Sequence, residues 1–213
     1  MEIAGSVLIG YLIGGFNPSF VIAKIKGFDI RKSGSGNAGG SNALITMGRI
    51  IGVFCMIFDI FKSYFAIWLS GLIAPEFEYV LPVCGTSCIL GHVFPVYMKF
   101  RGGKGLACLG GVVLAFSPAV FGIMFASELV LALLFDYICV VPITASIVFP
   151  IVYGLMTDSA TGAMILAISS LVIILKHVEN LRRISEGREM HLSYLWKGKK
   201  EVDRVLKNMQ KDL

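Results

Sequence analysis

Charged residues are scarce in this chain: Asp, Glu, Lys and Arg make up 15% of its 213 residues, whereas hydrophobic residues make up 56%. Roughly a quarter of the residues in a soluble domain are charged, so the composition excludes an ordinary soluble globular protein. Apolar runs such as 50–60 and 163–175 are typical of segments that lie in a lipid bilayer. The composition therefore predicts an integral membrane protein.

The apolar runs also lack the alternation of polar and apolar residues that the strands of a membrane barrel need. Because only helices and closed barrels satisfy the backbone inside lipid, we predict an all-α, polytopic membrane helix bundle. The first apolar segment has neither a basic start nor a small-residue cleavage site, so we interpret it as a span and not as a removed signal.

The cysteines show no disulfide pattern: there are five, an odd number, and all lie in apolar surroundings. We interpret them as reduced packing residues. Cys84 and Cys88 are one helical turn apart, but no His or second Cys pair completes a metal site with them, so neither a metal nor a cofactor is predicted. No basic and aromatic groove pattern is present, so the net charge of +5 is attributed to membrane orientation. The predicted surroundings are membrane lipid, with no nucleic-acid partner.

Three spans are predicted in the first half of the chain, at 3–25, 50–73 and 79–97, the first of them interrupted at Asn17. Apart from Lys62, the Lys and Arg residues gather after the first span, after the third span, and from residue 176 onward. The positive-inside rule puts all three basic regions on the cytoplasmic side. The N-terminus is therefore predicted outside and the C-terminus in the cytoplasm.

The interval between Lys104 and Lys176 must then cross the membrane an even number of times. It has about 70 residues and one span needs roughly 17–25, so four short spans fit better than two spans with long apolar loops. Breaks are expected at Ser117, at Asp136 and at 156–158. We therefore predict seven transmembrane helices, with five as the alternative.

The chain divides into a predicted membrane domain, 1–191, and a basic C-terminal tail, 192–213. In the tail, the spacing of the apolar residues predicts a short amphipathic helix on the inner leaflet. These apolar residues are Val202, Val205, Leu206 and Met209.

Three charged residues fall well inside predicted spans, away from their ends. Asp59 and Lys62 are three apart in the second span, so they share a helix face that is expected to point into the bundle. A structural ion pair that holds two spans together and a role in the site are both open for them. Glu128 lies in the fourth or fifth crossing and needs a partner that the sequence does not identify.

The first candidate site is the glycine-rich stretch 33–42. Its glycines permit positive φ, which lets successive N–H groups converge on an anion. Side-chain donors are available from Ser35, Asn37, Ser41 and Asn42. The alternative is a flexible linker between two spans.

Two more clusters lie on the same predicted side of the membrane. At 102–105 the glycines allow close approach of the backbone to a ligand, and Lys104 supplies a point charge for phosphate, although the Walker A spacing is missing. In the third cluster, His177 is a candidate general base and Asn180 a candidate oxyanion donor. Together the three clusters predict an anion site at the inner face of the membrane.

These clusters resemble the motifs of the bacterial glycerol-3-phosphate acyltransferases that use acyl-phosphate as donor, the PlsY family. The family's GSGN-x-G-x-[ST]-N pattern matches 34–42. Its GH-x-x-P and F-x-GGKG-x-A patterns match 91–95 and 100–107. Its H-x-x-N-x-x-R pattern with a later G-x-E matches His177, Asn180, Arg183, Gly187 and Glu189.

The resemblance implies an enzyme of the bacterial cytoplasmic (inner) membrane that moves an acyl group from acyl-phosphate to the sn-1 hydroxyl of glycerol 3-phosphate. Its products are lysophosphatidic acid and phosphate, with no use of acyl-CoA or a metal. The chain lacks the H-x-x-x-x-D signature of soluble-type acyltransferases, so a substrate phosphate is expected to accept the hydroxyl proton. The implied catalytic residues are Ser35, Lys104, His177 and Asn180. The implied substrate-binding residues are Gly34, Gly36, Asn37, Gly39, Ser41, Asn42, Arg49, His92, Gly102, Gly103 and Arg183.

The chain departs from the family pattern at several positions. Ile45 stands where the family usually has Arg, and Arg49 can reach the same phosphate if this stretch is one continuous helix. In a middle span, Asp136, Cys139 and Pro142 align with an Arg and two Ser of the family. These losses leave an alternative open: a diverged, non-catalytic or transport-type membrane protein that binds phosphate-containing anions.

Overall fold

The computed structural model describes residues 1–189, 191–193 and 198, and the regular secondary structure in this part of the chain is helical, without strands. Most of the predicted amphipathic tail, 192–213, lies outside the described residues. The described elements are α1 (Glu2–Gly15), α2 (Pro18–Ile25), η1 (Ile30–Lys32), α3 (Gly40–Met47), α4 (Arg49–Ile73), α5 (Val80–Val93), η2 (Val96–Met98), α6 (Leu106–Phe116), α7 (Pro118–Phe135), α8 (Val140–Thr157) and α9 (Ala160–Ser185).

Six helical segments in the described part of the chain are long and apolar enough to cross a membrane, which confirms the prediction of an all-α membrane bundle. They are Glu2–Ile25, Arg49–Ile73, Val80–Met98, Pro118–Phe135, Val140–Thr157 and Ala160–Ser185. The remaining predicted span corresponds to α6, which is apolar but has only 11 residues. At 1.5 Å per residue α6 is about 17 Å long, roughly half the hydrocarbon thickness of a bilayer.

The helix boundaries in the second half of the chain fall where the sequence predicted breaks. Ser117 is the N-cap of α7, where its hydroxyl accepts a hydrogen bond from Val120 N at 3.3 Å. Asp136 ends α7 and Asp158 ends α8, each with a left-handed backbone of φ 58° and 53°. Such a residue directs the chain out of the helix. The predicted break in the first span is also confirmed, because Asn17 caps α2 by accepting from Phe20 N at 2.8 Å.

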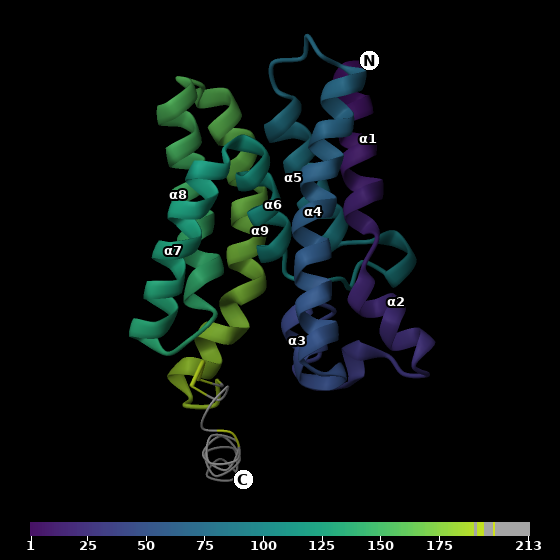
Figure 1. Ribbon diagram of the computed structural model, residues 1–213, viewed down its shortest axis with the longest axis vertical. Coiled ribbons are helices and arrows are strands. Elements are labelled where there is room, and N and C mark those ends of the chain that lie inside the picture. The colour runs from purple at the N-terminus through teal and green to yellow at the C-terminus, as the bar shows by residue number, and fades with distance from the viewer. Residues whose placement is uncertain (190, 194–197, 199–213) are drawn as a thin grey trace.

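Small residues hold α1 against α5. Methyl groups added at Gly10, Gly14 or Gly91 would overlap the backbone of the facing helix, so these two helices pack with their main chains in contact. α4 lies beside them, and α7 and α8 form the other side of the bundle, with α6 and α9 between the two sides (Figure 1).

A buried carboxyl on α7 finds its partner on α8. Thr144 Oγ1 donates to Glu128 Oε2 at 2.6 Å, and Glu128 is 8% exposed. This contact answers the question that the sequence left open, since a carboxyl at membrane depth needs a hydrogen-bond donor.

The turn after α2 and the last turns of α9 lie toward the end of the bundle away from the N-terminus, and the loop between α5 and α6 lies about midway along the bundle (Figure 1). The fold thus brings together three segments that are far apart in the sequence.

Candidate active site

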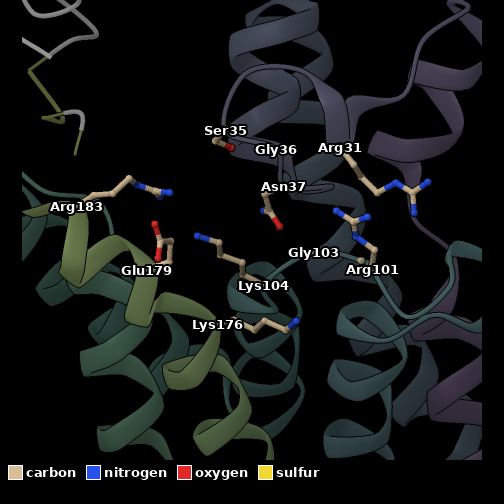
Figure 2. Close-up of a pocket in the computed structure, with 11 residues that line it drawn as sticks. Arg31, Ser35, Gly36, Asn37, Arg101, Gly103, Lys104, Lys176, Glu179 and Arg183 are labelled. Carbon is tan, nitrogen blue, oxygen red and sulfur yellow. The ribbon is translucent and has the colours of Figure 1, made fainter. Parts of the chain in front are cut away.

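An open pocket of about 240 Å³ lies where these three segments meet. Its lining residues are Arg31, Ser35, Gly36, Asn37, Arg101, Gly102, Gly103, Lys104, Lys176, Glu179 and Arg183. Figure 2 shows Arg183 and Glu179 on one side of the opening and Arg31 and Arg101 on the other, with Asn37 and Lys104 between them. Among these lining residues five side chains are cationic and one is a carboxylate. Two of the cations, Arg31 and Arg183, are paired with carboxylates outside the lining.

The glycine-rich loop 33–39, between η1 and α3, is called the first loop, and it folds around the side chain of Asn42, which is 0% exposed. Asn42 Oδ1 accepts from Ser35 N at 2.8 Å, and Nδ2 lies within 2.8–3.0 Å of three carbonyl oxygens of the loop. Gly34 has a φ of 58°, and a Cβ there would overlap the Asn42 amide. The structure therefore places Asn42 inside the loop and Gly34 against its amide, with Ser35 at the exposed edge.

Other residues predicted in this segment lie off the pocket. Gly39 is buried behind Asn37, and Ser41 is exposed on the first turn of α3. Arg49 is exposed and does not line the pocket, so the expected continuous helix is wrong. The reason is Gly48, whose φ of 94° ends α3 and starts α4 in a new direction.

Arg31 lines the pocket although the sequence did not single it out as a binding residue. Its guanidinium donates to both carboxylate oxygens of Asp29. At 2.7 Å it also donates to Met98 O of the second loop, which is the chain between α5 and α6, 94–105. The hydrogen bonds from Arg31 hold the pKa of Asp29 well below its usual value, so the pair stays ionised. Arg101, Lys176 and Glu179 were also missed, and the only signal for them was their position in basic clusters.

The second loop is packed tightly against His92. Gly102 N donates to Val93 O and Gly103 N donates to His92 O, both at 3.1 Å. A Cβ on Gly102 or Gly103 would overlap His92, so only glycine fits at either position. His92 itself is 3% exposed and lies beneath the loop, not in the pocket lining. The predicted substrate contact is therefore corrected to a supporting one, because the loop covers the imidazole.

A chain of polar contacts joins the second loop to α9. Lys104 Nζ donates to Asn180 Oδ1, and Asn180 Nδ2 donates to Glu189 Oε1 at 2.6 Å. Arg183 Nε donates to Glu189 Oε2 at 2.7 Å. The carbonyl of the Asn180 amide thus faces the ammonium, while its NH₂ group faces the carboxylate. Burial, and then the nearby charge of Arg183, lower the pKa of Lys104 below its usual value of 10.5.

His177 lies on the same face of α9 and is 6% exposed. Its Nδ1 is 2.8 Å from Ile173 O. A carbonyl oxygen can only accept, so Nδ1 carries the hydrogen and Nε2 keeps a lone pair. His177 does not line the pocket, but it presents a hydrogen-bond acceptor from the helix turn that carries Asn180.

The departure at Asp136 has a structural explanation. Its carboxylate accepts from Ser193 N at 2.7 Å and from Ser193 Oγ at 2.8 Å. The residue that replaces the family's Arg therefore anchors the chain that follows α9. Cys139 and Pro142 are buried at the start of α8, and Ile45 is exposed on α3.

Comparisons with known proteins agree with the motifs. The family model described as glycerol-3-phosphate acyltransferase matches residues 4–187. A glycerol-3-phosphate acyltransferase of Thermosipho melanesiensis is 36% identical over 204 residues, which cover 94% of this chain and all of the relative. One of Symbiobacterium thermophilum is 31% identical and covers 90% of this chain and 95% of the relative.

Two solved structures have the same fold. The glycerol 3-phosphate form of PlsY, an integral membrane glycerol 3-phosphate acyltransferase, superposes with a TM-score of 0.82 at 32% identity, covering 92% of this chain and 98% of that one. Its lysophosphatidic acid form gives a TM-score of 0.78 at 31% identity, covering 90% and 95%. The family match over most of the chain, the similar relatives and the shared fold lead to one conclusion: this chain belongs to the glycerol-3-phosphate acyltransferase family.

Proposed function

We propose that this protein transfers an acyl group from acyl-phosphate to the sn-1 hydroxyl of glycerol 3-phosphate, forming lysophosphatidic acid and phosphate. The observation that carries the proposal is the charge of the pocket. A phosphate monoester has a charge of about −1.5 to −2 near neutral pH, so it is attracted to a pocket lined by five cations, whose charge still exceeds that of Glu179 and of the two paired carboxylates, Asp29 and Glu189. Cations on both sides of one open pocket fit a reaction in which both substrates are phosphates.

Four of the five cationic residues in the lining divide between the two phosphates, while Arg31 is held by Asp29 and by Met98 O. Lys104 and Arg183, which are linked through Asn180 and Glu189, bind one phosphoryl group. Arg101 and Lys176 bind the other from the opposite side of the pocket. These cations hold the reacting atoms together, and positioning of this kind can supply several kcal/mol of the barrier reduction.

Small polar groups complete the binding of the substrates. The Ser35 hydroxyl donates to a phosphate oxygen from the edge of the first loop. His177 lies behind the lining, and the lone pair on its Nε2 is the acceptor that a group entering beside Asn180 would meet.

In the reaction, the oxygen of the glycerol hydroxyl forms a bond to the acyl carbon. The bond between that carbon and the phosphate oxygen breaks, and its electron pair leaves with the phosphate. The hydroxyl proton passes to a phosphate oxygen. Cationic side chains around the pocket stabilise the negative charge that develops on the leaving group.

The proposed setting is the cytoplasmic (inner) membrane of a bacterium, with seven membrane segments that include the short α6. The N-terminus is outside and the pocket opens on the cytoplasmic side, where the basic loops belong by the positive-inside rule. The acyl chain of the donor stays in lipid while its phosphate enters the pocket. A non-catalytic or transport-type role is not favoured, because the relatives that match almost the whole chain are acyltransferases.

The test is an assay of the purified full chain in proteoliposomes, with acyl-phosphate and acyl-CoA supplied side by side. With glycerol 3-phosphate as acceptor, lysophosphatidic acid is expected to form from acyl-phosphate but not from acyl-CoA. Lys104→Ala should abolish its formation, while Lys26→Ala, which removes an exposed cation outside the pocket, should not. Absence of product from the unaltered chain with acyl-phosphates of several chain lengths would refute the proposed function.

A further inference from the structure

A charged cluster lies buried beneath the pocket, between α1, α4 and α5. Asp59 and Lys62 on α4 and His92 on α5 are 2%, 5% and 3% exposed. Lys62 Nζ is 2.7 Å from Phe16 O, 2.7 Å from Asp59 Oδ1 and 3.0 Å from His92 Nδ1. An ammonium group has hydrogens but no lone pair, so Phe16 O and His92 Nδ1 both accept from it, while Asp59 is its ion-pair partner. Nδ1 of His92 is then an acceptor, and its ring hydrogen is on Nε2.

The ion pair within this cluster does not join two helices, because Asp59 and Lys62 are both on α4. The hydrogen bonds that connect different elements are those from Lys62 to Phe16 and to His92, and Asp59 Oδ1 also lies 3.5 Å from His92 Nδ1. Each of these two neighbours leads to a different loop of the pocket.

Through Phe16, the ammonium reaches the first loop. Phe16 is the C-cap of α1, where carbonyl groups lose their helical partners and a positive charge is favourable. The next residue, Asn17, is 0% exposed, and its Nδ2 donates to Ala38 O at 2.7 Å. The glycine-rich loop is thus held by the residue that directly follows the one bound to Lys62.

Through His92, the ammonium reaches the second loop. The imidazole of His92 packs directly against Gly103, so that a Cβ on Gly103 would overlap Nε2. The carbonyl of His92 also accepts from Gly103 N at 3.1 Å. Lys104 directly follows Gly103, so the orientation of the His92 ring determines the backbone position of Lys104.

We propose that Lys62 is a positioning residue that sets the separation of the two phosphate-binding loops from below, without touching the substrates itself. The predicted effect of Lys62 on the KM rests on the proposed function, whereas its predicted effect on the two loops does not. Loss of the ammonium would release Phe16 and His92 together, so both loops would loosen at once.

The main test is a double variant, Lys62→Met with Asp59→Leu. Replacing a buried ion pair by apolar residues of similar size is often neutral or stabilising, so this variant is expected to fold. Hydrogen–deuterium exchange should rise in both 33–40 and 101–105. The KM for glycerol 3-phosphate should rise about tenfold, as expected from the loss of contacts to a charged group, with a smaller change in kcat and a thermal midpoint close to that of the unaltered chain.

A matched control removes another buried polar pair that contacts neither loop. Glu128→Leu with Thr144→Val does so on α7 and α8, and it should leave the exchange of both loops and the KM unchanged. The single variant His92→Asn keeps an acceptor near Nδ1 but removes the ring from Gly103. It should therefore loosen 101–105 and leave 33–40 protected.

The outcomes separate this inference from the proposed function. Unaltered protein without acyltransferase activity would refute the proposed function, while the exchange measurement would still decide the role of Lys62. If the double variant has the exchange of both loops and the KM of the unaltered chain, Lys62 is not a positioning residue. If the double variant does not fold, His92→Asn decides: equal exchange in 101–105 would overturn the proposal.

Discussion

Asn180 gives the sharpest test of how the pocket is built. Its side-chain amide stands between Lys104, which donates to its carbonyl, and Glu189, which accepts from its NH₂ group. Asn180→Ala removes both contacts and leaves an ammonium and a buried carboxylate without this partner. Because Glu189 also holds Arg183, the change should disturb two of the proposed phosphate-binding cations.

The expected loss follows from the two contacts. A hydrogen bond to a charged group contributes about 1.5–3 kcal/mol, so losing both would cost about 3–6 kcal/mol if nothing compensated. The pocket is open, and Lys104 can recover part of this by binding water. We therefore expect a loss of about 2–3 kcal/mol in transition-state binding, which is a decrease of about 30- to 150-fold in kcat/KM.

The measurement is the initial rate of lysophosphatidic acid formation with glycerol 3-phosphate varied at a fixed level of acyl-phosphate. A thermal unfolding curve of the same sample separates lost positioning from lost structure. Glu179→Gln is the matched comparison, because it removes the carboxylate of the pocket lining on the same helix and should lower the KM. A kcat/KM of Asn180→Ala within threefold of the unaltered chain would refute the reasoning.

Three further predictions follow from the pocket. The pKa of Lys104 lies below 10.5 and its charged form binds phosphate, so kcat/KM should fall as the pH rises, with a midpoint below pH 10.5. Lys104→Arg should abolish this decrease, because arginine stays charged. Arg183→Gln removes a nearby cation and should move the decrease to higher pH. Arg49→Ala should change kcat/KM by less than about twofold, because Arg49 is exposed outside the pocket, and a larger loss in the same assay would contradict the corrected assignment. Gly103→Ala should raise the KM for glycerol 3-phosphate about tenfold or more, since the added methyl group overlaps His92 and displaces the loop; an unchanged KM would show that the loop can yield.

Local chemistry explains why much of the fold was predictable. Ser117, Asp136 and Asp158 stop or start helices through contacts and backbone conformations within a few residues of themselves. The basic clusters were also visible as composition, so their convergence on one pocket could be predicted from the positive-inside rule.

The roles of individual site residues depend on packing across the bundle, which sequence spacing does not contain. Asn42 and His92 have polar side chains in glycine-rich motifs, which suggested contact with a ligand, yet both are buried and support a loop. The prediction that Arg49 reaches the phosphate site was wrong for a different reason: a single positive φ at Gly48 redirects the chain. Lys176 and Arg31 reach the pocket only through the tertiary arrangement.

The shortness of α6 has a consequence for how two unlike reactants meet. A helix of about 17 Å cannot have one end at each surface of a bilayer about 30 Å thick, so the chain on at least one side of it is sunk below the surface. Lys104 lies two residues before α6, on the side where the pocket opens. In the proposed reaction, a depression on the Lys104 side of α6 would let the water-soluble acceptor descend and the lipid-anchored donor move sideways to the same place, so that neither would have to leave its own phase.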